Sequence, residues 1–177
     1  MDNIKMITAA LILVALLSIG IMSGIKPISS TVVSPIVEEQ GVTFPSPTSY
    51  VVDQSDVLSE STENALFQKL KEFDGKAQIA VVTIKTTGSM SEEEYAIKLA
   101  EQWKVGHAGK DNGIIFLIVT GDRKLRIEVG RGLEGVMNDA KAGRILDDYV
   151  VPELKKNNWE AGITKGVDAI MKEVSYE

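Results

Sequence analysis

Carboxylate and amide side chains flank a pair of strands that the sequence predicts over residues 113–119 and 124–129. Asp111 and Asn112 come directly before the first strand, whereas Glu134, Asn138 and Asp139 follow the second. The two arms of a hairpin are antiparallel, so the start of the first arm lies beside the end of the second. We therefore expect these five side chains to gather at one edge of the sheet, which we call the acidic edge.

Oxygen atoms of carboxylates and amides are the ligands that Ca²⁺ and Mg²⁺ prefer in proteins. Asp111, Asn112, Glu134 and Asp139 are therefore the predicted ligands of a divalent cation. The same residue types also have ordinary structural uses, and this alternative stays open. Asp139 suits a helix N-cap, Asn112 and Asn138 suit turns, and Glu134 suits a solvated surface.

Other charged residues are weaker candidates. Asp53 and Asp56 precede a predicted helix and, if the first strands are parallel, lie at the opposite edge of the sheet, so we interpret them as turn residues. Arg126 and Arg144 are the cations that could hold a phosphate group near the acidic edge. Arg144 could equally form an ion pair with Asp147, one helical turn along the chain.

The single histidine and the glycine-rich segments carry less information. His107 lies in a loop and could act as a base or a metal ligand, but a lone loop histidine without a nearby carboxylate or nucleophile is more often solvated, and we expect this of His107. Residues 106–110 are too short for a P-loop. Residues 130–135 fit G-x-G-x-x-G, but the preceding strand is the second arm of a hairpin, and Glu134 would stand where a pyrophosphate must approach. The sequence therefore predicts no nucleotide site.

The elements that must position the acidic edge alternate along the chain. Runs of β-branched residues predict strands at residues 50–52, 78–84, 113–119 and 124–129. Helices are expected after Ser59 or Ser61, after Ser91 with Glu94 in a capping box, across residues 139–150, and from Trp159 onward. The third helix should stop before Pro152, which lacks an N–H group. The predicted order is β-α-β-α-β-β-α-α.

Composition excludes several classes of function. The net charge is −6 and the isoelectric point is about 5.0, so a nucleic-acid partner is not expected, since affinity for phosphate backbones comes from clustered Lys and Arg. The chain has no cysteine, which excludes disulfides, thiolate nucleophiles and Cys-ligated metals.

An apolar stretch near the N-terminus predicts a membrane anchor. Residues 6–25 carry no charge and, at about 1.5 Å per residue, are long enough to cross a bilayer core as one helix. We therefore divide the chain into an anchor or uncleaved signal over residues 1–26, a linker rich in Pro, Ser and Thr over 27–47, and one folded domain over 48–177. The short N-terminus favours a single-pass protein whose domain lies outside the cytoplasm, although Lys5 and Lys26 give little charge asymmetry.

The folded domain also resembles the TPM domain family. The resemblance rests on motifs that follow one another in order, at residues 50–58 (YVVDQSDVL), 78–83 (QIAVVT), 103–106 (WKVG), 109–113 (GKDNG), 122–130 (DRKLRIEVG), 132–135 (GLEG) and 142–145 (AGRI). Within these motifs, the family pattern includes the positions of Asp53, Asp111, Asn112, Glu134 and Arg144. The resemblance implies a three-layer α/β/α sandwich, usually outside the cytoplasm.

The family includes a thylakoid-lumen phosphatase linked to photosystem repair, many uncharacterised prokaryotic proteins, and members that bind Ca²⁺ or other divalent cations. Two functions are therefore expected as alternatives. The favoured one is an accessory or interaction module with a divalent-cation site, acting on a membrane-protein partner. The other is a metal-dependent phosphatase that acts on phosphate esters.

Overall fold

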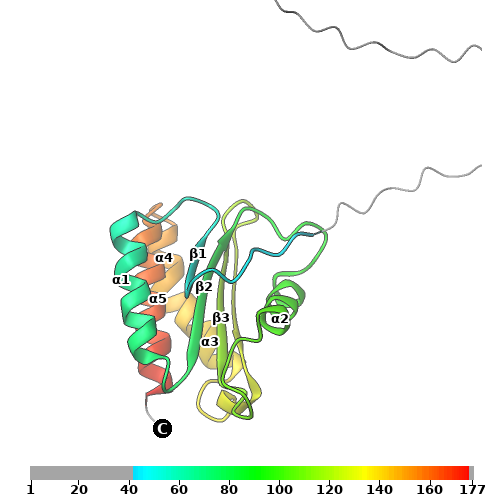
Figure 1. Ribbon diagram of the computed structural model, residues 1–177. Coiled ribbons are helices and arrows are strands. Elements are labelled where there is room, and N and C mark those ends of the chain that lie inside the picture. The colour runs from blue at the N-terminus through cyan, green and yellow to red at the C-terminus, as the bar shows by residue number, and fades with distance from the viewer. Residues whose placement is uncertain (1–41, 176–177) are drawn as a thin grey trace, which may run out of the picture. The chain divides into compact units, whose positions relative to one another are not determined.

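The computed structural model describes residues 42–175, which form a mixed α/β fold with helices on both faces of a four-stranded sheet (Figure 1). The strands are β1 (Val51–Asp53), β2 (Gln78–Ile84), β3 (Gly113–Val119) and β4 (Lys124–Val129). Their order is β1-β2-β3-β4. The first three are parallel, and β4 is antiparallel to β3. The predicted hairpin is confirmed.

Helices follow the strands in the predicted sequence. They are α1 (Glu60–Phe73), α2 (Glu92–Trp103), α3 (Asp139–Ile145), α4 (Val151–Leu154) and α5 (Trp159–Val174). The hydroxyls of Ser59 and Ser91 cap α1 and α2, each accepting a hydrogen bond from the backbone N–H three residues along. The first two helices therefore begin where the sequence places them.

The predicted end of the third helix is wrong. The chain stays helical past residue 150, because a π-helical turn over Leu146–Val150 joins α3 to α4. Pro152 lies in the first turn of α4. The N–H groups of a first turn have no acceptor within their own helix, so proline, which lacks an N–H group, costs no hydrogen bond there. The π-helical turn therefore carries the chain from α3 into α4 without a break between the helical segments.

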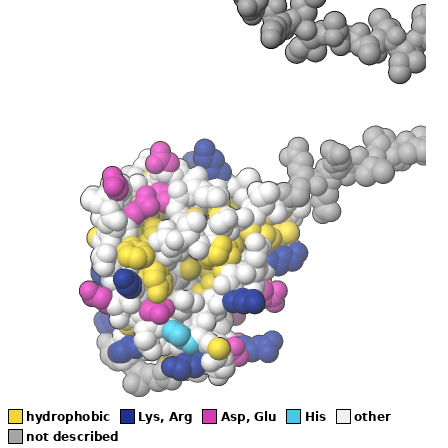
Figure 2. Space-filling view, in the orientation of Figure 1, with side chains coloured by type: hydrophobic (Ala, Val, Ile, Leu, Met, Phe, Trp, Pro, Cys, Tyr) yellow, Lys and Arg dark blue, Asp and Glu magenta, His cyan; other side chains and the backbone are white. Residues whose placement is uncertain are grey.

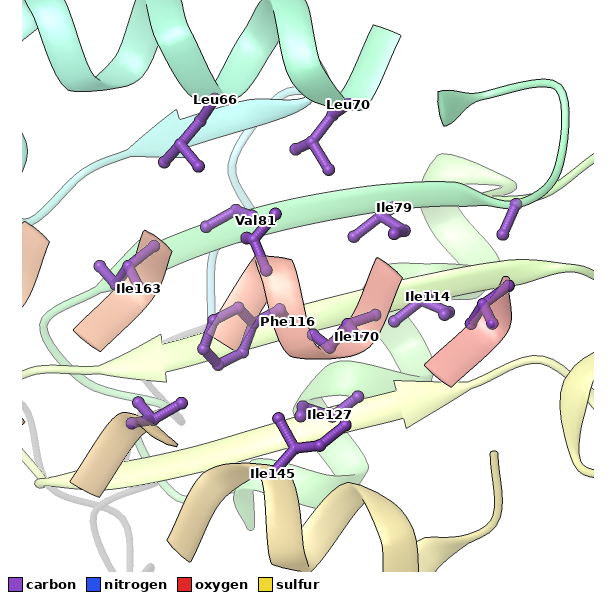
Figure 3. Close-up of a cluster of buried hydrophobic side chains, with 14 of the residues drawn as sticks. Leu66, Leu70, Ile79, Val81, Ile114, Phe116, Ile127, Ile145, Ile163 and Ile170 are labelled. Carbon is purple, nitrogen blue, oxygen red and sulfur yellow. The ribbon is translucent and has the colours of Figure 1, made fainter. Parts of the chain in front are cut away.

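The core lies on both faces of the two central strands. Val81 of β2, Phe116 of β3 and Ile127 of β4 are buried against α1, α3 and α5, as Figure 3 shows for Phe116 beneath Ile170. The alternate residues of β2 and β3 form a second, smaller cluster under α2. Strands buried on both faces read as continuous apolar runs, which is why β2 and β3 are recognisable in the sequence.

The end of the predicted linker packs against the domain. Residues 42–47 run along α2 as an extended arm, in which the ring of Phe44 lies 4.7 Å from that of Tyr95, centroid to centroid. The indole N–H of Trp103 donates a hydrogen bond to the carbonyl oxygen of Pro45, at 2.8 Å. These residues therefore help to cover the α2 face of the sheet.

The predicted anchor over residues 1–26 and the linker as far as residue 41 lie outside the described residues. Within residues 42–175, none of the helices has both the length and the apolar character needed to cross a membrane.

Candidate functional site

The two loops of the acidic edge meet, as the hairpin topology predicts. The backbone N–H of Gly130 donates to the carbonyl oxygen of Gly113 at 2.8 Å, and that of Gly132 donates to the carbonyl oxygen of Asp111 at 3.0 Å. A methyl group on Gly132 would overlap the carbonyl oxygen of Lys110. The glycines after β4 therefore serve close contact between two backbones, in a loop that continues as a 3-10 turn over Arg131–Leu133.

Asn112 fixes three segments at this edge. Its side-chain oxygen accepts hydrogen bonds from the backbone N–H of His107 at 2.9 Å and from the ring nitrogen Nδ1 of the same residue at 3.0 Å. Its amide nitrogen donates to the carbonyl oxygen of Lys76, at 2.8 Å, in the turn after α1. Only 5% of Asn112 is exposed, and both its side-chain oxygen and its side-chain nitrogen form hydrogen bonds within the protein.

The three carboxylates of the acidic edge point to solvent. Asp111, Glu134 and Asp139 are all exposed, and Asp111 has a φ of 48°, in the left-handed region. Across residues 42–175 the structure brings no three Asp, Glu or His side chains together in a group that could hold a metal ion. The loops that carry Asp111 and Glu134 meet at this edge, whereas Asp139 contacts Arg126 of β4 and the side-chain oxygen of Asn112 already accepts two hydrogen bonds. A cation at this edge would therefore draw on water as well as on protein oxygens.

The sequence left open that Asp139 is a helix N-cap, but the structure gives this role to Asn138. Asn138 caps α3, because its side-chain oxygen accepts a hydrogen bond from the N–H of Lys141 at 3.1 Å. Asp139 follows as the first helical residue, and its exposed carboxylate lies 3.5 Å from the guanidinium of Arg126.

Arg126, one of the two candidate phosphate-binding arginines, is already surrounded by carboxylates. Its guanidinium lies 2.8 Å from Glu128, 3.5 Å from Asp139 and 3.8 Å from Glu93. Desolvation alone would lower the pKa of Arg126, but the hydrogen bond and negative charge of Glu128 outweigh it and raise that pKa. Arg144, the other candidate, is exposed in the last turn of α3. Among the described residues, no carboxylate lies within ion-pair distance of it.

His107 lies nearer to a carboxylate than the sequence suggests. Its Nε2 atom is 3.5 Å from Asp74, which comes from the end of α1, and its ring is only partly exposed. As the single histidine of the chain, it can be seen at the lower part of the surface in Figure 2. The expectation of a solvated histidine with no acidic neighbour is therefore wrong, because Asp74 is 33 residues away along the chain and is brought near only by the fold.

Asp74 also affects a neighbouring tyrosine. Desolvation first, and then the negative charge of Asp74, raise the pKa of the Tyr50 hydroxyl. One carboxylate oxygen of Asp74 is buried and has no hydrogen-bond partner among the described residues. Tyr50, Asp74, His107 and Asn112 thus form a polar cluster beside the acidic edge, which the sequence analysis missed.

Asp53 and Asp56 lie at the opposite edge of the sheet, as predicted. The carboxylate of Asp53 accepts hydrogen bonds from the backbone N–H groups of Val57 and Leu58, both at 2.8 Å, and from the hydroxyl of Thr83. Asp56 has a φ of 56°, as short polar residues in turns often do. Asp53 therefore holds the turn between β1 and α1, and its role as a turn residue is confirmed.

Comparisons with known proteins agree with this fold. The model of the TPM domain family matches residues 51–173. The N-terminal domain of a protein from P. gingivalis is 32% identical with a TM-score of 0.66, over 72% of this chain and 82% of that one. No curated protein matches the chain.

Two further solved structures are similar in fold. The BA42 protein from the psychrophilic bacterium Bizionia argentinensis has a TM-score of 0.60 at 16% identity, over 70% of this chain and 85% of that one. The N-terminal domain of the cg2496 protein from Corynebacterium glutamicum has a TM-score of 0.56 at 16% identity, over 77% of this chain and 88% of that one. Because the family model spans most of the sequence, the chain belongs to the TPM domain family.

Proposed function

We propose that this TPM domain is an accessory or interaction module at a membrane surface outside the cytoplasm, and that its acidic edge binds Ca²⁺ or Mg²⁺. The bound cation would complete a surface for a membrane-protein partner. The observation that carries the proposal is the arrangement around Asn112, which anchors the loop of Asp111 while the carboxylates of Asp111 and Glu134 stay exposed.

Exposed carboxylates on a fixed loop suit weak, reversible cation binding. Ca²⁺ takes 6 to 8 oxygen ligands, so two or three carboxylates leave several positions to water or to a partner's oxygens. Sites of this kind in extracellular modules have dissociation constants of about 0.1 to 1 mM. An affinity in this range lets a partner that supplies further oxygens raise the occupancy of the site.

The alternative function, a metal-dependent phosphatase, has less support from the geometry. A phosphate ester needs a cation that is free to meet its charge. Arg126 is committed to Glu128, Asp139 and Glu93, so only Arg144 of the two candidate arginines is left for this role. The alternative predicts that p-nitrophenyl phosphate is hydrolysed in the presence of Mg²⁺ and that Glu134→Ala abolishes this turnover without unfolding the protein. The module predicts cation binding without turnover.

We expect calorimetric titration of the full chain in mild detergent to show saturable binding of Ca²⁺ with a dissociation constant of about 0.1 to 1 mM. Asp111→Ala and Glu134→Ala should each weaken binding about tenfold, because each removes an ionised oxygen ligand. Asp148→Ala removes the same charge from an exposed position of the π-helical turn and serves as the control. Equal weakening by all three substitutions would mean that the cation responds only to net charge, and this would contradict the proposed site.

A further inference from the structure

A cavity of about 580 Å³ lies at the edge of the sheet opposite to the acidic edge. It opens between the β3–β4 turn and the junction of α4 with α5, all of which meet at the upper edge in Figure 1. This is the side of the sheet where the parallel strands end, and ligands of open α/β sheets bind outside the carboxyl ends of such strands.

The inner walls of the cavity are apolar. Ile118 and Val119 are buried, and Leu125, Leu154 and Trp159 are half-buried. The volume is within the range of small-molecule pockets, about 300 to 1,000 Å³. An indole and several aliphatic side chains can therefore cover the apolar body of a small ligand.

The rim of the cavity is cationic. Arg123, Lys124 and Lys155 line it, and its lining contains no carboxylate, although the chain as a whole has a net charge of −6. Lys124 is 3.1 Å from Glu92, so its charge is partly neutralised. In the part of the chain that the structure describes, Arg123 and Lys155 have no carboxylate within ion-pair distance. Two cations are thus available to a ligand at the mouth of an apolar cavity.

The start of α5 presents further backbone N–H groups beside the cavity, although Glu160 in the same turn carries a negative charge and accepts a hydrogen bond from the N–H of Ser59. α5 is 16 residues long, and among the described residues no side chain caps its first turn at Asn158. Uncapped N–H groups carry the positive end of the helix dipole. Asn157 and Trp159, on either side of this helix start, both line the cavity.

We propose that this cavity binds a small organic anion, in which a carboxylate or phosphate group meets Arg123 and Lys155 while an apolar body lies against Trp159. A neutral molecule of the same shape would leave the cations unpaired, and a bare anion would leave the apolar walls in contact with water. Both halves of the ligand are therefore needed. The cavity and the acidic edge lie at opposite edges of the sheet, so this site does not depend on the proposed cation site.

The test uses Trp159 as a reporter within the full chain. Trp103→Phe leaves Trp159 as the only tryptophan, since the chain has two. Benzoate and phenyl phosphate are titrated beside benzyl alcohol, which is their neutral analogue, and inorganic phosphate, which lacks the apolar body. We expect a saturable change in tryptophan fluorescence with at least one of the two organic anions. Benzyl alcohol and inorganic phosphate should bind at least about tenfold more weakly. The ratio of the two organic anions shows whether the site prefers a carboxylate or a phosphate.

Substitutions on the rim complete the test. Replacing Arg123 and Lys155 with glutamine should weaken binding of the organic anion about tenfold or more. Replacing Lys71 and Lys172 with glutamine removes the same charge from exposed helix positions away from the cavity, and this control should not change the affinity.

Calorimetry of the unmodified chain checks that Trp103→Phe has not altered the protein. The proposal is overturned if neither organic anion shows saturable binding, if benzyl alcohol or inorganic phosphate binds as well as the better organic anion, or if the control pair weakens binding as much as the rim pair.

Discussion

Asn112→Ala is expected to lower the free energy of unfolding by about 2 to 4 kcal/mol. The amide of Asn112 is 5% exposed and joins the loop of His107 to the turn at Lys76. Removing it leaves the N–H group of His107 and the carbonyl oxygen of Lys76 without partners in a place that water reaches poorly. Denaturant unfolding of the full chain measures the change, and an unaltered slope would show that the loss lies in stability alone.

Asn138→Ala provides a matched control at the same edge. Asn138 is exposed and makes a single capping bond to the N–H of Lys141, so its loss should cost about 1 kcal/mol. If Asn112→Ala cost no more than Asn138→Ala, then the side chain of Asn112 would not be what holds its loop to the turn at Lys76.

Gly132→Ala is expected to destabilise the protein by about 2 to 3 kcal/mol. The added methyl group would overlap the carbonyl oxygen of Lys110, and the two loops would have to separate and lose the bond between Gly132 N–H and the carbonyl oxygen of Asp111. Because the backbone fixes the position of the methyl group and the oxygen is itself a backbone atom, no side-chain rotation can relieve the overlap. Thermal and denaturant unfolding measure this effect.

Gly135 is the control within the same G-x-G-x-x-G segment. A methyl group there would meet no atom within 4 Å, so Gly135→Ala should change stability by less than about 0.5 kcal/mol. Equal effects of the two substitutions would show that the glycines act only through chain flexibility and would contradict the close contact between the loops.

The arrangement of strands and the meeting of the two loops could be predicted from local patterns. β2 and β3 are uninterrupted apolar runs, and β4 alternates between buried Ile127 and polar neighbours, so their burial follows from the sequence. A hairpin then fixes where its ends lie. For this reason the positions of Asp111 and Glu134 on one edge were predictable without knowledge of distant contacts.

The details of the site depend on contacts between residues far apart in the chain. Asn112 turns inward because the carbonyl oxygen of Lys76, 36 residues earlier, needs a donor. Asp74 meets His107 only after α1 and α2 have packed on opposite faces of the sheet. Pro152 is a strong local signal for a helix end, yet a π-helical turn before it keeps the chain helical. Local patterns identify the residue types at the acidic edge, whereas packing decides which of them reach the solvent.

The central claim, that the acidic edge binds a divalent cation, is tested most directly by residue-resolved NMR of the ¹⁵N-labelled full chain during a Ca²⁺ titration. We predict saturable shifts of the backbone amides around Asp111, Asn112, Glu134 and Asp139, with a common midpoint, and none around Asp53 at the opposite edge. Absence of shifts at the acidic edge, or shifts spread equally over all exposed carboxylates, would contradict a cation site there.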